Sequence, residues 1–168
     1  MKIFNYCPSC GSKDITFDGI NKFICKECSF TYFHNVAAAA AVILEYDQKV
    51  LFTIRAKDPG KGKLDLPGGF VDPKESAEDA LKREVKEELE IKIEKLEYLG
   101  SFPNIYEYKD VFYNVCDLFF CSKITAVPTD FDKTEIKEII LLNRKEIPID
   151  KVAFESTRNF LRYFCNIR

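Results

Sequence analysis

Apolar residues recur with two different spacings along the chain, and the change of spacing separates expected helices from expected strands. Between residues 77 and 89 they occupy every fourth position, the spacing of a helix with one buried face. The stripe consists of Ala77, Leu81, Val85 and Leu89. We therefore expect a helix over residues 76–90, capped at its start by Ser76 with Asp79 as its capping-box partner.

Continuous apolar runs elsewhere predict strands. Residues 36–46 and 49–55 flank the turn-like pair Asp47-Gln48, a pattern that predicts a hairpin. Alanines at 37–41 also permit a helix, but the Val-Ile-Leu run that follows them favours a short buried strand. A glycine- and lysine-rich loop is expected next, over residues 56–66. The remaining expectations are strand-rich segments over 91–102, 111–123 and 136–142, and helical spacing over 149–166.

Composition narrows the class of protein. The chain has 168 residues, 46% hydrophobic and 31% charged, with a formal charge of −2, which is typical of a folded domain without a global attraction to nucleic acid or anionic membrane. No apolar run approaches the roughly 20 residues that span a bilayer, and the first residues lack the apolar segment of a signal peptide. We expect a cytoplasmic protein that acts away from membranes.

Three glutamates share one face of the expected helix, beside its apolar stripe: Glu84, Glu87 and Glu88. Like charges at this spacing destabilise a helix by about 0.2–0.5 kcal/mol, and the helix dipole disfavours them near the C-terminal end. Shared divalent cations, Mg²⁺ or Mn²⁺, would explain the arrangement, because hard cations prefer oxygen ligands. The alternative is a solvated acidic face with ion pairs to neighbouring basic side chains.

The surrounding spacing favours the metal interpretation. Five residues separate Gly69 from Glu75, and seven more precede the run Arg83-Glu84-Val85-Lys86-Glu87-Glu88. This pattern resembles the Nudix box, and residues 66–70 are similar to its usual lead-in. The sequence departs from the box at Glu90, where the family has a glycine that ends the helix in a left-handed conformation.

The resemblance implies a fold and a set of roles. It implies an α/β/α sandwich with a mixed β-sheet, and a Mg-dependent pyrophosphohydrolase. Glu84, Glu87 and Glu88 would bind magnesium with the Gly69 carbonyl, while Glu75 and Arg83 would form an ion pair that ties the loop to the helix. The proton acceptor stays open among Glu87, Glu88 and Glu135, of which Glu135 is equally read as a surface turn residue.

Four cysteines near the N-terminus form two Cys-x-x-Cys pairs with 14 residues between them: Cys7, Cys10, Cys25 and Cys28. Four thiolates complete a tetrahedral zinc site, and a closed site of this kind is structural. The disulfide or redox alternative fits a reducing compartment less well. We expect a zinc ribbon over residues 1–34, a Nudix domain over 35–168, and core positions for Cys116, Cys121 and Cys165.

A ribbon joined to a Nudix box is similar to the NADH pyrophosphatase branch of the family, as is the junction at residues 32–36. That branch carries Ser-Gln-Pro-Trp-Pro-Phe-Pro after its box, whereas this chain has no tryptophan and reads Gly-Ser-Phe-Pro-Asn-Ile-Tyr over residues 100–106. The expected substrate is therefore the wider class of nucleoside diphosphates linked to another group, such as NAD(H), ADP-ribose or a nucleotide sugar. Candidates for stacking on a base are Phe102, Tyr106, Tyr108 and Tyr113.

Two other functions compete with this one. The box would also be retained in a catalytically weak nucleotide-binding or regulatory module, although the intact glutamates favour an enzyme. A nucleic-acid-associated ribbon protein is disfavoured by the near-neutral charge. Many members of the family are homodimers, which makes a homodimer an expectation from resemblance alone.

Overall fold

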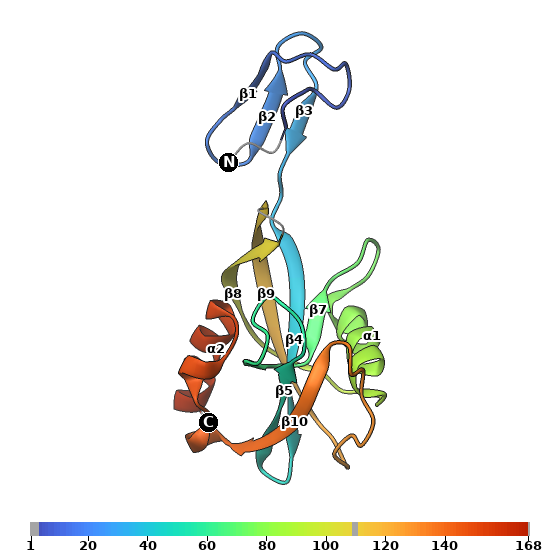
Figure 1. Cartoon of the computed structure of the whole chain (residues 1–168), viewed down its shortest axis with the longest axis vertical. Coiled ribbons are helices and arrows are strands. Elements are labelled where there is room, and N and C mark those ends of the chain that lie inside the picture. The colour runs from blue at the N-terminus through green and yellow to red at the C-terminus, as the bar shows by residue number, and fades with distance from the viewer. Residues whose placement is uncertain (1–3, 109–110, 168) are drawn as a thin grey trace. The chain divides into compact units, whose positions relative to one another are not determined.

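The computed structural model describes residues 4–108 and 111–167, which form two compact units, Met1–Val36 and Ala37–Arg168 (Figure 1). Within these described ranges, neither helix has the length and apolarity needed to cross a bilayer.

The first unit is a small antiparallel sheet with cysteine-bearing turns. Its strands are β1 (Ile15–Phe17), β2 (Lys22–Cys25) and β3 (Thr31–Phe33), in the order β1-β2-β3. The two Cys-x-x-Cys turns have the same backbone geometry. Gly11 and Ser29 each follow a second cysteine with φ of 76° and 60°, and each donates its N–H to the carbonyl of the first cysteine over 2.9 Å. The turns therefore present their thiols in equivalent ways.

The second unit is built on a seven-stranded mixed sheet. Its path runs β10-β5-β4-β9-β8, with β6 paired to β5 and β7 paired to β4. Strand β4 runs parallel to β9, and the other pairings are antiparallel. The bounds are β4 Ala37–Tyr46, β5 Lys49–Arg55, β6 Leu64–Asp65, β7 Gly68–Phe70, β8 Glu97–Tyr108, β9 Val111–Lys123 and β10 Ile136–Asn143.

Helix α1 (Ala77–Leu89) covers one face of this sheet (Figure 1). Ser76 caps it by accepting a hydrogen bond from the Asp79 N–H over 3.1 Å. Its buried stripe packs against alternate residues of the central strands, among them Val42, Leu44 and Leu51. Leu81, Val85 and Leu89 are at most 1% exposed. Since each such side chain contributes about 1.5–3 kcal/mol, this stripe fixes the helix on the sheet.

Helix α1 ends at Glu90 in the left-handed conformation, with φ of 55° and ψ of 17°. The Glu90 N–H donates to the Lys86 carbonyl over 3.1 Å. The chain thus keeps the helix ending that a glycine would favour, at a cost of about 1–2 kcal/mol for a side chain in this region.

Helix α2 (Glu155–Ile167) covers the opposite face (Figure 1). Phe160 stacks on Phe119 of β9 with ring centroids 4.1 Å apart and an interplanar angle of 9°. Leu161 and Phe164 complete the contact with Ile43 and Val50 of the central strands. The two helices and the sheet between them make the expected α/β/α sandwich.

Several element boundaries differ from the sequence expectations. Four expected elements are confirmed within one or two residues: the hairpin at Asp47-Gln48, the helix at 76–90, and the strands at 111–123 and 136–142. The strand expected over 91–102 is wrong in its position, because it spans Glu97–Tyr108, while Ile91 and Ile93 pack as irregular chain against α1. Residues 149–151 form a 3₁₀ turn, so the last helix starts at Glu155.

Candidate functional site

Strand β7 brings two glycines into close contact with β4 and α1. Gly68 has φ of 146°, and a Cβ there would overlap the Ala40 carbonyl oxygen and lie 2.8 Å from the Ala41 Cα. A Cβ at Gly69 would overlap the carboxylate of Glu84. The glycines therefore allow the α1 carboxylates to reach the backbone of β7.

Arg83 ties helix α1 to the loop that precedes it. Its Nε and Nη2 donate to the two carboxylate oxygens of Glu75, each over 2.9 Å, and Nη2 also donates to the Phe70 carbonyl over 3.1 Å. Nη1 donates to Glu84 over 2.8 Å. The bond from Arg83 holds the pKa of Glu75 below its usual range, against burial, which raises it. This bidentate pair fixes the loop geometry.

Glu84 and Glu88 are half-buried acids with other acids beside them. Burial raises the pKa of Glu88 to about 8, and the charges of Asp65, Glu84 and Glu135 raise it as well, although the Gly68 N–H donates to it over 3.2 Å. Burial also raises the pKa of Glu84, while Arg83 lowers it. Carboxylates under such mutual repulsion are ionised together only if positive charge joins them, and this donor set fits a hard divalent cation.

Glu135 reaches these glutamates from a distant part of the chain. It lies in the segment before β10, where its carbonyl accepts the Ala56 N–H over 2.8 Å. The same segment is bonded to the end of α1, since the Asp132 N–H donates to the Glu88 carbonyl over 2.9 Å. The Glu135 carboxylate forms an ion pair with Lys57. These contacts hold the residue beside the box.

Glu84, Glu88, Glu135 and Gly69 line one cavity of about 300 Å³, but Glu87 does not. The Glu87 side chain is 60% exposed and contacts Arg83 Nη1 over 3.3 Å. Over the described residues, no three carboxylates have oxygens within 4.8 Å of one another. The structure thus brings together three of the four acids expected around the cation, and Glu87 lies outside the cavity.

Residues 34–164 match the family model of the NUDIX domain, which is more than half of the chain. The chain belongs to the Nudix family. Similar curated proteins include the NAD-capped RNA hydrolase NudC of Pseudomonas fluorescens, 32% identical over 98 residues that cover 57% of this chain and 34% of that protein. The NAD-capped RNA hydrolase of Schizosaccharomyces pombe is 29% identical over 115 residues, 60% of this chain and 31% of that protein. The chain spans about a third of the length of these relatives.

Solved Nudix structures share the fold. A NUDIX hydrolase from Nitrosomonas europaea has a TM-score of 0.71 and 24% identity, and the match covers 98% of this chain and 92% of that one. A MutT NUDIX hydrolase from Burkholderia pseudomallei has a TM-score of 0.66 and 22% identity over 76% of this chain and 97% of that one. The sandwich and the mixed sheet expected from the box are therefore confirmed.

Two buried aspartates, Asp65 and Asp117, line the 300 Å³ cavity, hereafter the Nudix cavity, and were not predicted from the sequence. Asp65 is buried and accepts a 2.7 Å bond from Arg55 Nη1, and burial raises the pKa of Asp65 to about 6 although Arg55 lowers it. Asp117 is buried on β9. The signal for both aspartates was present, because each interrupts an apolar segment, at Leu64-Asp65-Leu66 and within 115–121.

Aromatic residues form part of the wall of the Nudix cavity. Tyr106 lies between Phe70 and Phe154, with ring centroids 5.4 Å and 5.9 Å away. All three rings line the cavity. Phe102 instead packs against Phe119 and Phe160 in the core, Tyr113 does not line the cavity, and the Tyr108 side chain lies outside the described residues. Of the three aromatic candidates whose side chains the structure describes, Tyr106 is the one placed at the site.

The small residues of β4 leave room for this cavity. Ala39, Ala40 and Ala41 line it, and Ala39 lies opposite Asp117 in the parallel pairing with β9. The alanine run that was ambiguous in the sequence is thus a central strand. Its small side chains leave the adjoining space open.

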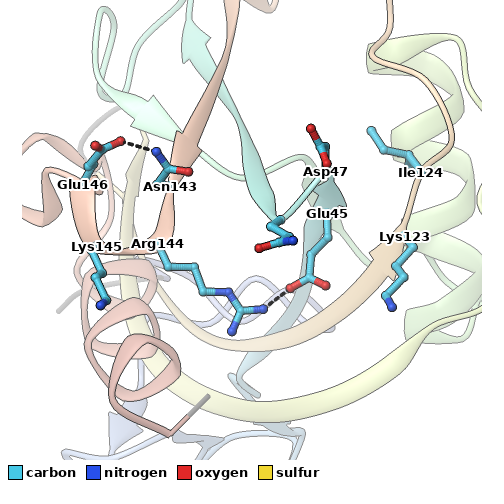
Figure 2. A pocket seen from close by; sticks show the side chains of 9 residues that line it. Glu45, Asp47, Lys123, Ile124, Asn143, Arg144, Lys145 and Glu146 are labelled. Atoms are coloured by element: carbon cyan, nitrogen blue, oxygen red, sulfur yellow. Dashed lines mark hydrogen bonds and ion pairs between the residues drawn. The ribbon is translucent and has the colours of Figure 1, made fainter.

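A larger depression of about 740 Å³ lies at the other end of the sheet, where β4, β9 and β10 end (Figure 2). Figure 2 shows Arg144 directed at Glu45, with which it forms an ion pair. Arg144 also lies over the Phe164 ring at 4.4 Å. Because its charges are mixed and it contains no residue of the Nudix box, this depression is a weaker candidate than the smaller cavity.

The four N-terminal cysteines form the second candidate site. Their sulfur atoms all lie within 4.8 Å of one another, with Cys7–Cys28 and Cys10–Cys25 separations of 3.7 Å. A tetrahedron with Zn–S bonds of about 2.3 Å has S–S edges of about 3.8 Å, so the thiols fit zinc. Burial raises the pKa of Cys7, but the N–H groups of Cys10 and Ser9 lower it to about 7. Of the other three cysteines, Cys121 is buried, and Cys116 and Cys165 are half-buried.

Proposed function

We propose that this protein hydrolyses the diphosphate of a nucleoside diphosphate linked to another moiety, in the class of NAD(H), ADP-ribose and nucleotide sugars. The observation that carries the proposal is the cavity in which Glu84, Glu88 and Glu135 share one space with aromatic side chains. The carboxylates would hold Mg²⁺ or Mn²⁺, which in turn binds the diphosphate, and the aromatic rings would stack on a base.

The cation would be held by α1 and β7. We assign the carboxylates of Glu84 and Glu88 and the carbonyl of Gly69 as ligands, and we include Glu87, which would reach the cation by rotation of its exposed side chain. When bound, Mg²⁺ neutralises diphosphate charge and lowers the pKa of a bound water. Glu75 and Arg83 keep the loop and Glu84 in place through their bidentate pair.

We assign proton acceptance to Glu135. It faces the box glutamates from another segment, and Lys57 orients its carboxylate by the ion pair. Glu88 is the alternative, but its bond to the Gly68 N–H favours a ligand role. Glu135→Gln is then expected to lower kcat at least ~100-fold with little change in Mn²⁺ affinity. Glu88→Gln is expected to weaken Mn²⁺ binding itself, measured by calorimetry.

The cavity volume favours recognition of one half of the substrate. About 300 Å³ is at the lower end of small-molecule sites, which favours one nucleotide unit over a whole dinucleotide. The second moiety would then extend outside the cavity. Relatives named as NAD-capped RNA hydrolases make a 5′ NAD-capped oligonucleotide a sensible member of the substrate panel.

Hydrolysis of a substrate panel tests the proposal. NAD⁺, NADH, ADP-ribose, a UDP-sugar and the capped oligonucleotide would be incubated with Mg²⁺, with phosphatase-coupled detection of the nucleoside monophosphates released. We expect turnover of at least one, lost with EDTA and reduced at least ~100-fold in Glu88→Gln. Tight binding of the panel without turnover would instead identify a regulatory Nudix module and overturn the proposal.

We also propose a structural Zn²⁺ bound by Cys7, Cys10, Cys25 and Cys28, in a ribbon over residues 1–34 that precedes a Nudix domain over 35–168. The support is the tetrahedral spacing of the thiols and the matching backbone of the two turns. A ribbon this small gains its stability from the metal rather than from an apolar core.

A further inference from the structure

The Nudix cavity contains a buried carboxylate that the proposed hydrolysis does not use. Asp117 of β9 is 9% exposed and lines the cavity with Tyr106 and Phe154. In the antiparallel pairing it lies opposite Phe102 of β8, and in the parallel pairing opposite Ala39 of β4. Its neighbours across both strands are thus apolar, so a charged group here needs hydrogen-bond partners.

Two side chains supply part of what Asp117 needs. The hydroxyl of Ser156, at the start of α2, donates to its Oδ2. The side chain of Asn104 donates to it as well, and the orientation of this amide is fixed because its Oδ1 accepts the Ile105 N–H over 3.0 Å. An ionised carboxylate has about four acceptor positions, so two donors leave capacity for a ligand.

We propose that Asp117 is a specificity-determining residue that accepts a hydrogen bond from an exocyclic –NH₂ group on a planar ring of the substrate, with Asn104 as its positioning residue. The proposal rests on the proposed hydrolase function and names the chemistry read by the same cavity. Tyr106 and Phe154 provide aromatic surface for the ring, and Asp117 provides the polar contact at its edge. An acceptor-only group rejects a ring that presents a carbonyl or carboxylate at that position.

Two rings of the expected substrates carry such a group: adenine through its amino group, and nicotinamide through its carboxamide. Four diphosphate substrates distinguish the two rings. NAD⁺ has both groups, nicotinamide hypoxanthine dinucleotide lacks the adenine amino group, nicotinic acid adenine dinucleotide lacks the carboxamide, and ADP-ribose has adenine alone. We expect kcat/KM of the wild-type chain to fall about tenfold or more for one deaminated analogue and to change little for the other.

Substitution of Asp117 distinguishes reading of the ring from a structural role. Asp117→Asn offers a donor as well as an acceptor, so the ratio of kcat/KM between matched and deaminated analogues is expected to fall to within about threefold. Asn104→Ala is expected to reduce the ratio partly. Ser156→Ala removes a contact with α2 but leaves the carboxylate, so the ratio is expected to persist. If Asp117 had only a structural role, its substitution would lower kcat/KM equally for all substrates and leave every ratio unchanged.

Binding of mononucleotides keeps this test independent of turnover. Affinities of AMP against IMP, and of nicotinamide mononucleotide against nicotinic acid mononucleotide, would be measured by calorimetry on the wild-type chain and on Asp117→Asn. Hydrolysis of all four substrates with equal kcat/KM would overturn the role of Asp117 and leave the hydrolase function intact. No hydrolysis, with a preference for AMP or nicotinamide mononucleotide that Asp117→Asn abolishes, would overturn the hydrolase and support the reading of the ring.

Discussion

The carboxylate of Glu84 lies against the Cα of Gly69, so closely that the site has no room for a Cβ at position 69. The atoms that would collide with this Cβ belong to the Glu84 carboxylate, which is the end of a flexible side chain, and even the farther carboxylate oxygen is only 2.9 Å from it. Gly69→Ala should therefore displace Glu84 and leave the fold in place.

For Gly69→Ala we expect hydrolysis to fall about 100-fold, because a displacement near 1 Å in a catalytic constellation has that effect. The free energy of unfolding should change by less than about 1 kcal/mol, since position 69 does not need a left-handed backbone. Hydrolysis rates and urea denaturation measure the two quantities. Unchanged hydrolysis would show that the position of Glu84 does not matter for the reaction.

Arg83→Lys should loosen the loop before α1. A lysine cannot reproduce the paired bonds to Glu75, so we expect about a 10–100-fold loss of activity and a loss of about 1–2 kcal/mol of stability. The adjacent Lys82, whose contact with Asp79 is 3.9 Å and exposed, is the matched control. Lys82→Ala should stay within about 0.5 kcal/mol of the wild type and keep its activity.

The metal-free protein should lose stability as the pH rises. Burial raises the folded pKa of Glu88 to about 8, above the value near 4.3 of an unfolded glutamate, so the folded state binds this proton more tightly. The resulting stability is present below pH ~4.3 and is lost as pH rises through 8. Asp65, with a pKa raised to about 6 mainly by burial, acts in the same direction at lower pH.

Glu88→Gln tests this pH dependence. The glutamine side chain at position 88 is uncharged at every pH, so in EDTA at pH 9 the variant should be more stable than the wild type by roughly 1–3 kcal/mol, with no gain near pH 4.5. Added Mg²⁺ should stabilise the wild type at pH 9 and leave Glu88→Gln nearly unchanged. Chemical denaturation at the two pH values measures both effects, and parallel pH profiles for the two proteins would contradict the assignment.

The helix, the box and the cysteine turns were predictable because each depends on short spacings within one segment. The β8 boundaries were not, because Glu97–Tyr108 is fixed by pairing with β9, which residue spacing does not reveal. The position of Glu135 was open for the same reason, since it follows from pairing of β10 with β5. Asp117 was missed because its neighbours come from α2 and β8, far away in sequence.

Zinc removal should unfold the ribbon selectively. We expect one zinc per chain by mass spectrometry, lost in Cys10→Ser, because a closed four-thiolate site needs every ligand. Amide hydrogen exchange over residues 4–36 should then rise while that of α1 and the central strands stays low. Cys116→Ser, a half-buried cysteine outside the cluster, is the matched control and should retain zinc. Zinc retained by Cys10→Ser would contradict the assignment.

Glu90→Gly should stabilise the protein by about 1 kcal/mol. Glycine removes the left-handed strain and a negative charge at the C-terminus of α1, although it loses more backbone entropy on folding. Glu90→Ala removes the charge but retains the strain, so it should gain less. Thermal and urea denaturation compare the variants. Equal stability of the two would show that the charge, and not the backbone, sets the effect.

Strand β10 has a consequence for how this domain works as a unit. Glu135 stands beside the box only because β10 closes the far edge of the sheet against β5, some fifty residues after the helix that carries the other glutamates. A fragment ending soon after α1 would contain the whole motif and still lack Glu135, one of the acids that line the cavity. The complete sheet is therefore needed to assemble the cavity that the motif lines.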